Sequence, residues 1–214
     1  MELFKYTHAC VRVEAGGRAL LVDPGVWAEA TALDGVSDIL VTHEHPDHVD
    51  VERIAAAAAA DPTLKVYAHG SVAAHLDIGD SLVAVAPGDQ FEAAGFRVRA
   101  VGGKHAEISH GLPDLPNVGF VIDTGSGDDA IYHPGDAFYV PDMPVATLLV
   151  PTGAPWLKLA EVLDFIAAVR PRRAYPIHDA LLSEAGQEFN DWWLDMESET
   201  DYARIPVGES ITLT

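Results

Sequence analysis

The chain has 214 residues, of which 49% are apolar, so it is long enough for one well-buried core, and we expect a single domain spanning residues 1–214. Its formal net charge is −20 at pH 7 and no cluster of Lys and Arg relieves this charge, which argues against binding to long nucleic acids. No apolar run approaches the roughly 18 to 20 residues of a membrane span, and the N-terminus lacks the layout of a signal peptide. We therefore expect a soluble, cytoplasmic protein. Its expected partner is a small-molecule substrate, and homo-oligomerisation is left open.

Short apolar stretches punctuated by Gly and Pro predict strands along most of the chain. In the first half the expected strands cover residues 2–8, 10–16, 18–25, 37–43, 64–70, 81–88, 90–95 and 96–103. In the second half they cover residues 117–125, 128–136, 146–153 and 172–179, and a last strand ends the tail 187–214. Helices are predicted for residues 49–62, 71–78, 156–170 and the first part of that tail. Because helices close each strand-rich half, we expect two sheets packed together with helices outside.

Three histidines and two aspartates crowd into the stretch VTHEHPDHVDV, residues 41–51, directly after a predicted buried strand. In an extended chain, residues two apart point the same way, so His43 and His45 can offer their imidazoles to one metal ion. Pro46 bends the chain, and beyond it Asp47 and His48 can turn toward a second ion. The pattern His-x-His-x-Asp-His therefore predicts a two-ion site, and the alternative is a cluster of surface histidines.

At this motif the sequence resembles the metallo-β-lactamase superfamily, whose members carry the same pattern at the end of a strand. The resemblance implies further ligands in a fixed order: His105 in GGKHAE, Asp136 in YHPGDAF as a carboxylate that bridges two metals, and His178 in YPIHDA. It also implies the fold class, an α+β αββα four-layer sandwich of two mixed β-sheets packed face to face, with helices outside and the metals at one edge. The stretches LLVDPG, HVD and PIH look most like the compact branch that includes proteins of the ascorbate-6-phosphate lactonase type.

The resemblance implies two divalent metal ions and a role for each ligand. The expected ligands of one ion are His43, His45 and His105, and those of the other are Asp47, His48 and His178, with Asp136 bridging both. Imidazoles with carboxylates suit Zn²⁺ first, with Mn²⁺ and Fe²⁺ also feasible. A hydroxide between the ions would be the nucleophile. Asp47 is the expected catalytic residue, because a carboxylate beside that hydroxide can orient it and accept its proton.

Other residues keep more than one interpretation. His8 is a candidate neighbour of the metals, and His110 could contact the substrate. His133 could support a metal ligand or lie exposed on an edge strand. Asp50 could orient a ligand imidazole or cap a helix. Cys10 is expected to be a small buried hydrophobe.

The expected function is hydrolysis of a small ester, lactone or phosphodiester. The alternative is an oxidoreductase like the sulfur dioxygenases of the same superfamily, which resemble the hydrolases but bind a single iron with part of the ligand set. A purely structural metal site is disfavoured, since such sites usually close with four ligands and most often include cysteine. Nothing in the loops predicts the substrate.

Overall fold

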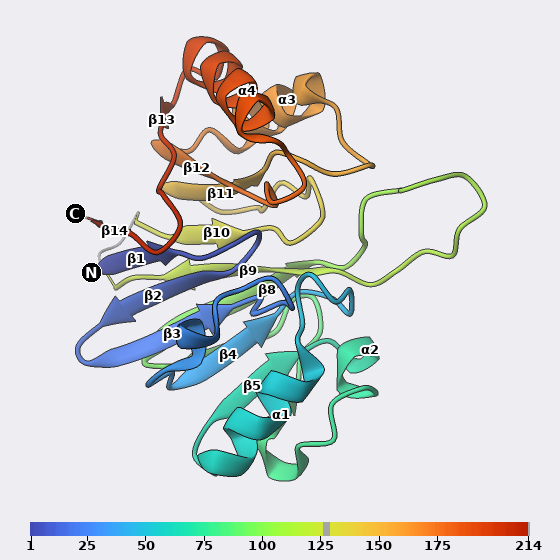
Figure 1. Cartoon of the computed structure of the whole chain (residues 1–214), viewed down its shortest axis with the longest axis vertical. Helices are drawn as coiled ribbons and strands as arrows, with labels where there is room; N and C mark the ends of the chain where they lie inside the picture. The colour runs from blue at the N-terminus through green and yellow to red at the C-terminus, as the bar shows by residue number, and fades with distance from the viewer. Residues whose placement is uncertain (126–128, 214) are drawn as a thin grey trace.

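A computed structural model of the chain describes residues 1–125 and 129–213. Two seven-stranded sheets pack face to face, and helices cover their outer surfaces (Figure 1). This arrangement confirms the expected αββα sandwich of two mixed sheets. Residues 128 and 214, at the ends of two expected strands, lie outside the described residues.

The first sheet begins as an antiparallel meander and continues as a parallel sheet. From edge to edge it contains β14 (Ser210–Thr212), β1 (Glu2–Lys5), β2 (Val11–Ala15), β3 (Arg18–Val22), β4 (Asp38–Val41), β5 (Lys65–Ala68) and β6 (Leu82–Ala84). Strands β14 to β3 pair antiparallel, and β3 to β6 pair parallel. The terminal strand β14 therefore extends the edge of the sheet formed by the first residues of the chain.

The second sheet has the same two-part organisation. From edge to edge it contains β13 (Asp201–Tyr202), β12 (Arg173–Ile177), β11 (Thr147–Pro151), β10 (Ile131–His133), β9 (Val118–Asp123), β8 (Phe96–Gly102) and β7 (Gln90–Ala93). Strands β7 to β10 pair antiparallel, which confirms the predicted hairpin of β9 and β10. Strands β10 to β13 pair parallel, so their carboxyl ends meet at one edge.

The helices lie outside the sheets and pack apolar side chains against them. They are α1 (Val51–Ala60), α2 (Gly70–Ala73), α3 (Leu159–Val169) and α4 (Glu184–Glu197), with short 3-10 turns η1 (Ala30–Leu33) and η2 (Gly79–Ser81). In α1, Ile54 and Ala58 are four residues apart and both are buried against the first sheet. The helix begins after Asp50, whose side chain accepts the N–H of Arg53, and it ends before Asp61.

The main core fills the space between the sheets. It includes Leu20 and Leu40 of the first sheet and Phe120 and Ile131 of the second, all fully buried. Separate apolar clusters join α1 and α2 to the first sheet and α3 and α4 to the second. Among the described residues, no helix is both long and apolar enough to cross a membrane.

Candidate metal centre

The candidate ligands converge where strands of both sheets end. His43, His45, Asp47 and His48 follow β4, Asp136 follows β10, and His178 follows β12. His105 comes from the start of the loop between β8 and β9. All seven residues that we expected from the sequence lie in one cluster, and five of them are buried while His45 and Asp47 are partly exposed, because both sheets and their loops surround them.

Two groups of side chains each bring their donor atoms within 4.8 Å of one another. The first donor group is His43, His45, His105 and Asp136, and the second donor group is His8, Asp47, His48 and His178. The carboxylate of Asp136 lies between the groups: its Oδ2 is 3.3 Å from His105 Nε2, whereas its Oδ1 is 3.1 Å from His48 Nε2. This placement suits a carboxylate shared between two ions.

Several buried donor atoms at the centre make no hydrogen bond with the described residues. They are the Nε2 atoms of His48, His105 and His178 and the Oδ1 atom of Asp136. Contacts of 3.0 to 3.3 Å between these rings and Asp136 lack hydrogen-bond geometry. Burying polar atoms without partners is costly, and metal coordination would satisfy them. The donor set of imidazoles and carboxylates therefore fits divalent metal ions.

The opposite ring nitrogens have partners that orient the imidazoles. His178 Nδ1 lies 2.8 Å from the carbonyl oxygen of Gly153, and His105 Nδ1 lies 2.6 Å from that of Ala106. Because a carbonyl can only accept, both Nδ1 atoms carry the hydrogen. In the neutral rings, the Nε2 lone pairs of these two histidines therefore face the centre, as metal binding requires.

The buried carboxylate of Asp23 orients two more imidazoles. Its Oδ2 lies 2.7 Å from His48 Nδ1 and accepts the hydroxyl of Thr42, also at 2.7 Å. Since the Thr42 hydroxyl donates to Asp23, its oxygen is free to accept from His43 Nδ1, 3.0 Å away. Asp23 thus directs the Nε2 atoms of His48 and His43 toward the centre.

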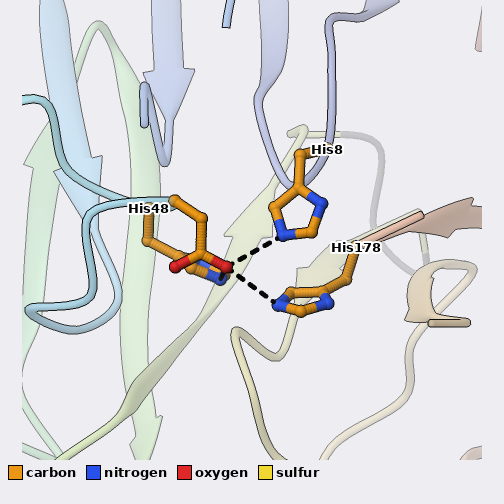
Figure 2. A group of neighbouring side chains, drawn as sticks. His8, His48 and His178 are labelled. Carbon is orange, nitrogen blue, oxygen red and sulfur yellow. Dashed lines mark hydrogen bonds and ion pairs between the residues drawn. The ribbon is translucent and has the colours of Figure 1, made fainter. Parts of the chain in front are cut away.

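His8 differs from the other histidines of the second donor group. Figure 2 shows the side chains of His8, His48 and His178 gathered in one place. Asp47 Oδ2 lies 3.1 Å from His8 Nε2 and 3.5 Å from His178 Nε2. The backbone N–H of Ala180 donates to His8 Nδ1 at 3.3 Å, so in the neutral ring the hydrogen sits on Nε2. His8 therefore donates to Asp47 instead of offering a lone pair to an ion.

The surroundings set the charge of each group. Burial lowers the pKa of His43 and of His45, which keeps both neutral at neutral pH. Burial also opposes a charge on His178, but its contacts with Asp136 and Asp47 outweigh burial and raise its pKa to about 9. Burial disfavours the charged form of Asp47, yet the contacts with His178 and His8 prevail and hold the pKa of Asp47 below its usual value.

Backbone packing holds Asp136 at the centre. The side chain of Asn117 accepts the N–H of Asp136 at 3.0 Å and donates to the carbonyl of Pro134 at 2.8 Å. Gly135 has a φ of +62°, and a Cβ there would lie 2.3 Å from Asn117 Oδ1, so only glycine fits the turn. The indole of Trp156 then donates to Asp136 Oδ2 at 3.2 Å.

The structure shows where the other residues with open interpretations lie. Asp50 is the N-cap of α1, and Cys10 is buried. His133 is fully buried, which excludes the exposed edge strand; it donates to the carbonyl of Ala9 and accepts the N–H of Gly135. His110 is fully exposed and pairs with Glu107 on the surface.

Sequence reasoning missed three residues that orient the ligands: Asp23, Asn117 and Trp156. Asp23 could have been noticed in the sequence, since its carboxylate directly follows the continuous apolar run of β3. The structure shows that it is completely buried, which is rare for an aspartate. In the sequence, Asn117 and Trp156 are only the first residues of an expected strand and an expected helix, and the folded chain alone brings them to Asp136.

The chain is similar to several known proteins. Residues 2–178 match the family described as Beta-lactamase superfamily domain. Protein Rv0786c of Mycobacterium tuberculosis is 36% identical over 213 residues, covering 99% of this chain and 100% of that protein. A protein of Aeropyrum pernix named as a metal-dependent hydrolase is 32% identical over 199 residues, covering 80% of this chain and 79% of that protein. The solved structure of Igni18, described as a novel metallo hydrolase from Ignicoccus hospitalis, matches with a TM-score of 0.75 at 18% identity and covers 100% of this chain and 98% of that one.

Proposed function

The chain belongs to the beta-lactamase superfamily, and from this premise we propose that it is a metal-dependent hydrolase of a small ester, lactone or phosphodiester. The observation that carries the proposal is the set of buried Nε2 atoms and the Asp136 oxygen that face one space without hydrogen bonds. The Aeropyrum pernix relative, which is named as a metal-dependent hydrolase, supports the same conclusion. The lactonase-like branch remains our proposal from the motifs.

The two donor groups suggest two ions. We assign one ion to His43, His45 and His105 and the other to Asp47, His48 and His178, with Asp136 shared between them. When bound, such ions supply Lewis acidity, which activates water and polarises the scissile bond. Asp47, His48 and His178 form a second ligand set beside the first, which favours two ions over the single iron of the alternative oxidoreductase. Zinc is our first choice for the metal.

The protein's own groups orient the reactants. Asp47 is held by the Nε2–H of His8 and is partly exposed, so its carboxylate can reach both a ligand ring and an entering substrate. We propose that Asp47 is the catalytic carboxylate that orients water and accepts its proton. On the other side of the centre, the indole of Trp156 fixes the direction of Asp136.

Metal content is the first test of this proposal. Protein purified without a tag under anaerobic conditions, analysed by elemental mass spectrometry, should hold about two zinc or manganese ions per chain. About one iron per chain would instead support the oxidoreductase, and oxygen consumption with persulfides would then replace the hydrolysis assay. Protein that neither holds nor takes up metal would contradict both functions.

Activity tests the role of Asp47. Changing Asp47→Ala should lower kcat on any ester, lactone or phosphodiester that the wild type hydrolyses by at least about a hundredfold, because an oriented carboxylate is lost. Circular dichroism should show an unchanged fold. The matched control is Asp77→Ala, at an exposed carboxylate on the first sheet's outer side, which should keep the wild-type rate. A wild-type rate in Asp47→Ala would refute the assigned role.

A further inference from the structure

A cavity of about 200 Å³ opens directly beside the first donor group. His45 and His105 form its inner end, and the long loop between β8 and β9, which projects from the sandwich in Figure 1, forms the rest. We call this space the entrance cavity. Its volume lies below the roughly 300 to 1,000 Å³ of pockets for drug-sized ligands, so it suits a small substituent.

Apolar side chains dominate the walls of the entrance cavity. Four apolar residues line it: Ile108, Leu112, Pro113 and Leu115. Two of them, Ile108 and Leu112, are large hydrophobic residues that are exposed on this loop. Exposed apolar side chains that gather around a concave space indicate a binding surface more than an ordinary solvent face.

The charged side chains that line the entrance cavity are acidic. Glu107 and Asp114 are among the lining residues, and no Lys or Arg is. Glu107 pairs with the exposed His110 at 2.6 Å, and Asp114 pairs with the exposed Lys104 at 2.9 Å. No unpaired side-chain cation therefore lines the loop walls to receive an anionic group away from the metal centre, and the net charge of −20 adds long-range repulsion of anions.

Backbone hydrogen bonds fix the base of the loop, so the entrance cavity is part of the ordered fold. The backbone N–H of His105 donates to the carbonyl of Leu115 at 2.9 Å, and that of Ala106 donates to the carbonyl of Asp136 at 2.8 Å. Both arms of the loop are thereby tied to each other and to the candidate metal centre.

We propose that the entrance cavity binds a small, uncharged, apolar substituent of the substrate while the scissile bond lies at the metal centre. This inference rests on the proposed hydrolase function and narrows it: neutral esters and lactones with short apolar chains are substrates, and compounds with a phosphate or carboxylate on that chain are not. Burying an unpaired anion against apolar walls is far more costly than burying a methyl group.

Binding to the metal-free protein tests the entrance cavity independently of catalysis. Methyl butyrate and monomethyl succinate differ only in a terminal methyl against a carboxylate. With ¹³C-labelled Ile and Leu methyl groups, methyl butyrate should cause saturable NMR shifts at Ile108, Leu112 and Leu115, and monomethyl succinate should not. The methyl groups of Leu163 on α3 serve as the control. Absence of saturable shifts with methyl butyrate, or equal shifts with both esters, would overturn the inference whatever the protein hydrolyses.

Turnover by the metal-loaded protein tests specificity. p-Nitrophenyl butyrate should exceed mono-p-nitrophenyl succinate in kcat/KM by at least about tenfold, since only the first buries an apolar chain end. Leu112→Arg places a cation at the cavity and should reduce this ratio about tenfold. Phe189→Arg on α4 is the matched control, because Phe189 and Leu112 are both 58% exposed, and it should leave the ratio unchanged.

The two tests separate the inference from the proposed function. An unchanged ratio in Leu112→Arg would overturn the entrance cavity as the specificity site. Failure to hydrolyse any ester, together with selective methyl shifts for methyl butyrate, would contradict the hydrolase and support the cavity as a binding site for apolar groups.

Discussion

At the scale of single residues, the hydrogen-bond partner of Nδ1 decides whether a histidine of the centre can bind a metal ion through Nε2. His178 and His8 lie with ring centroids 4.0 Å apart and both approach Asp47. The carbonyl of Gly153 holds a hydrogen on His178 Nδ1, whereas the N–H of Ala180 excludes one from His8 Nδ1. When both rings are neutral, the Nε2 of His178 therefore carries a lone pair and the Nε2 of His8 carries a hydrogen, and a search by residue type alone does not distinguish them.

We predict that His8 orients Asp47 and does not hold an ion. His8→Ala should lower kcat about tenfold to a hundredfold, a typical effect of losing a group that orients a ligand, while the number of metal ions per chain equals that of the wild type. His8→Gln retains an N–H donor and should recover part of the rate. Steady-state kinetics and elemental analysis of both variants provide the measurement.

The comparison of the two variants controls for backbone strain. His8 has a φ of +67°, a conformation that costs Ala and Gln alike, so strain does not separate them. A loss of one ion per chain in His8→Ala would show that His8 is a ligand. Equal rates in the two variants would show that donation to Asp47 is not its role.

At the scale of elements, two turns of the first sheet interlock beneath the centre. The turn after β3 and the turn after β4 exchange backbone hydrogen bonds: Val26 donates to Pro46, and Asp50 donates to Pro24. The guanidinium of Arg53 on α1 also binds the carbonyls of residues 25, 26 and 28. The ligand motif therefore rests on a rigid base.

Gly25 is the point where these turns are closest. A Cβ on residue 25 would lie 2.0 Å from the backbone oxygen of Asp47, and a backbone atom cannot move away cheaply. Gly25→Ala should therefore lower the free energy of unfolding by about 1 to 3 kcal/mol and reduce metal affinity, as overpacking of a rigid site does. Urea unfolding and a competitive chelator titration measure the two effects.

Gly70→Ala is the matched control for this change. Gly70 begins α2, and nothing lies within 4 Å of a Cβ added there, so this substitution should be neutral or slightly stabilising. Equal stabilities of the two variants would mean that the turns separate more easily than the structure indicates.

The sequence predicted the elements better than it predicted the contacts between them. The spacing of two residues was enough to predict that His43 and His45 lie on one side of a strand end, and the apolar pattern predicted α3 and the β9–β10 hairpin. His105, Asp136 and His178 could be assigned only through the resemblance, because their approach depends on the pairing of distant strands. Asp23 was missed for the same reason, since its partners lie on the neighbouring strand end.

At the scale of the whole molecule, the candidate centre connects the two sheets. The motif after β4 belongs to the first sheet, whereas Asp136 and His178 follow strands of the second. Next to His178, the buried Asp179 pairs with Lys5 near the N-terminus and with Arg204 near the C-terminus. A metal ion bound across the sheets should therefore stabilise the entire fold.

This stabilisation should depend on pH. In the metal-free protein the pKa of His178 is raised to about 9, so at neutral pH a proton occupies the nitrogen that an ion needs. That proton stabilises the metal-free fold fully below the unfolded pKa of about 6.5, and its contribution is lost as pH rises through about 9. Added zinc should therefore raise the free energy of unfolding more at about pH 8 than at about pH 6, by about 1.4 kcal/mol per pH unit for each displaced proton.

Urea unfolding with and without zinc at several pH values, in buffers that do not bind metal, measures this dependence. His75→Ala removes an exposed histidine outside the centre and should keep the slope of the wild type. Calorimetry of zinc binding in buffers with different ionisation enthalpies should report proton release at neutral pH by an independent route. A zinc effect that is constant from about pH 6 to about pH 8 would show that ions bind without displacing a proton, and would contradict the combination of a raised pKa for His178 and metal binding through its Nε2, because that nitrogen cannot carry a proton and an ion together.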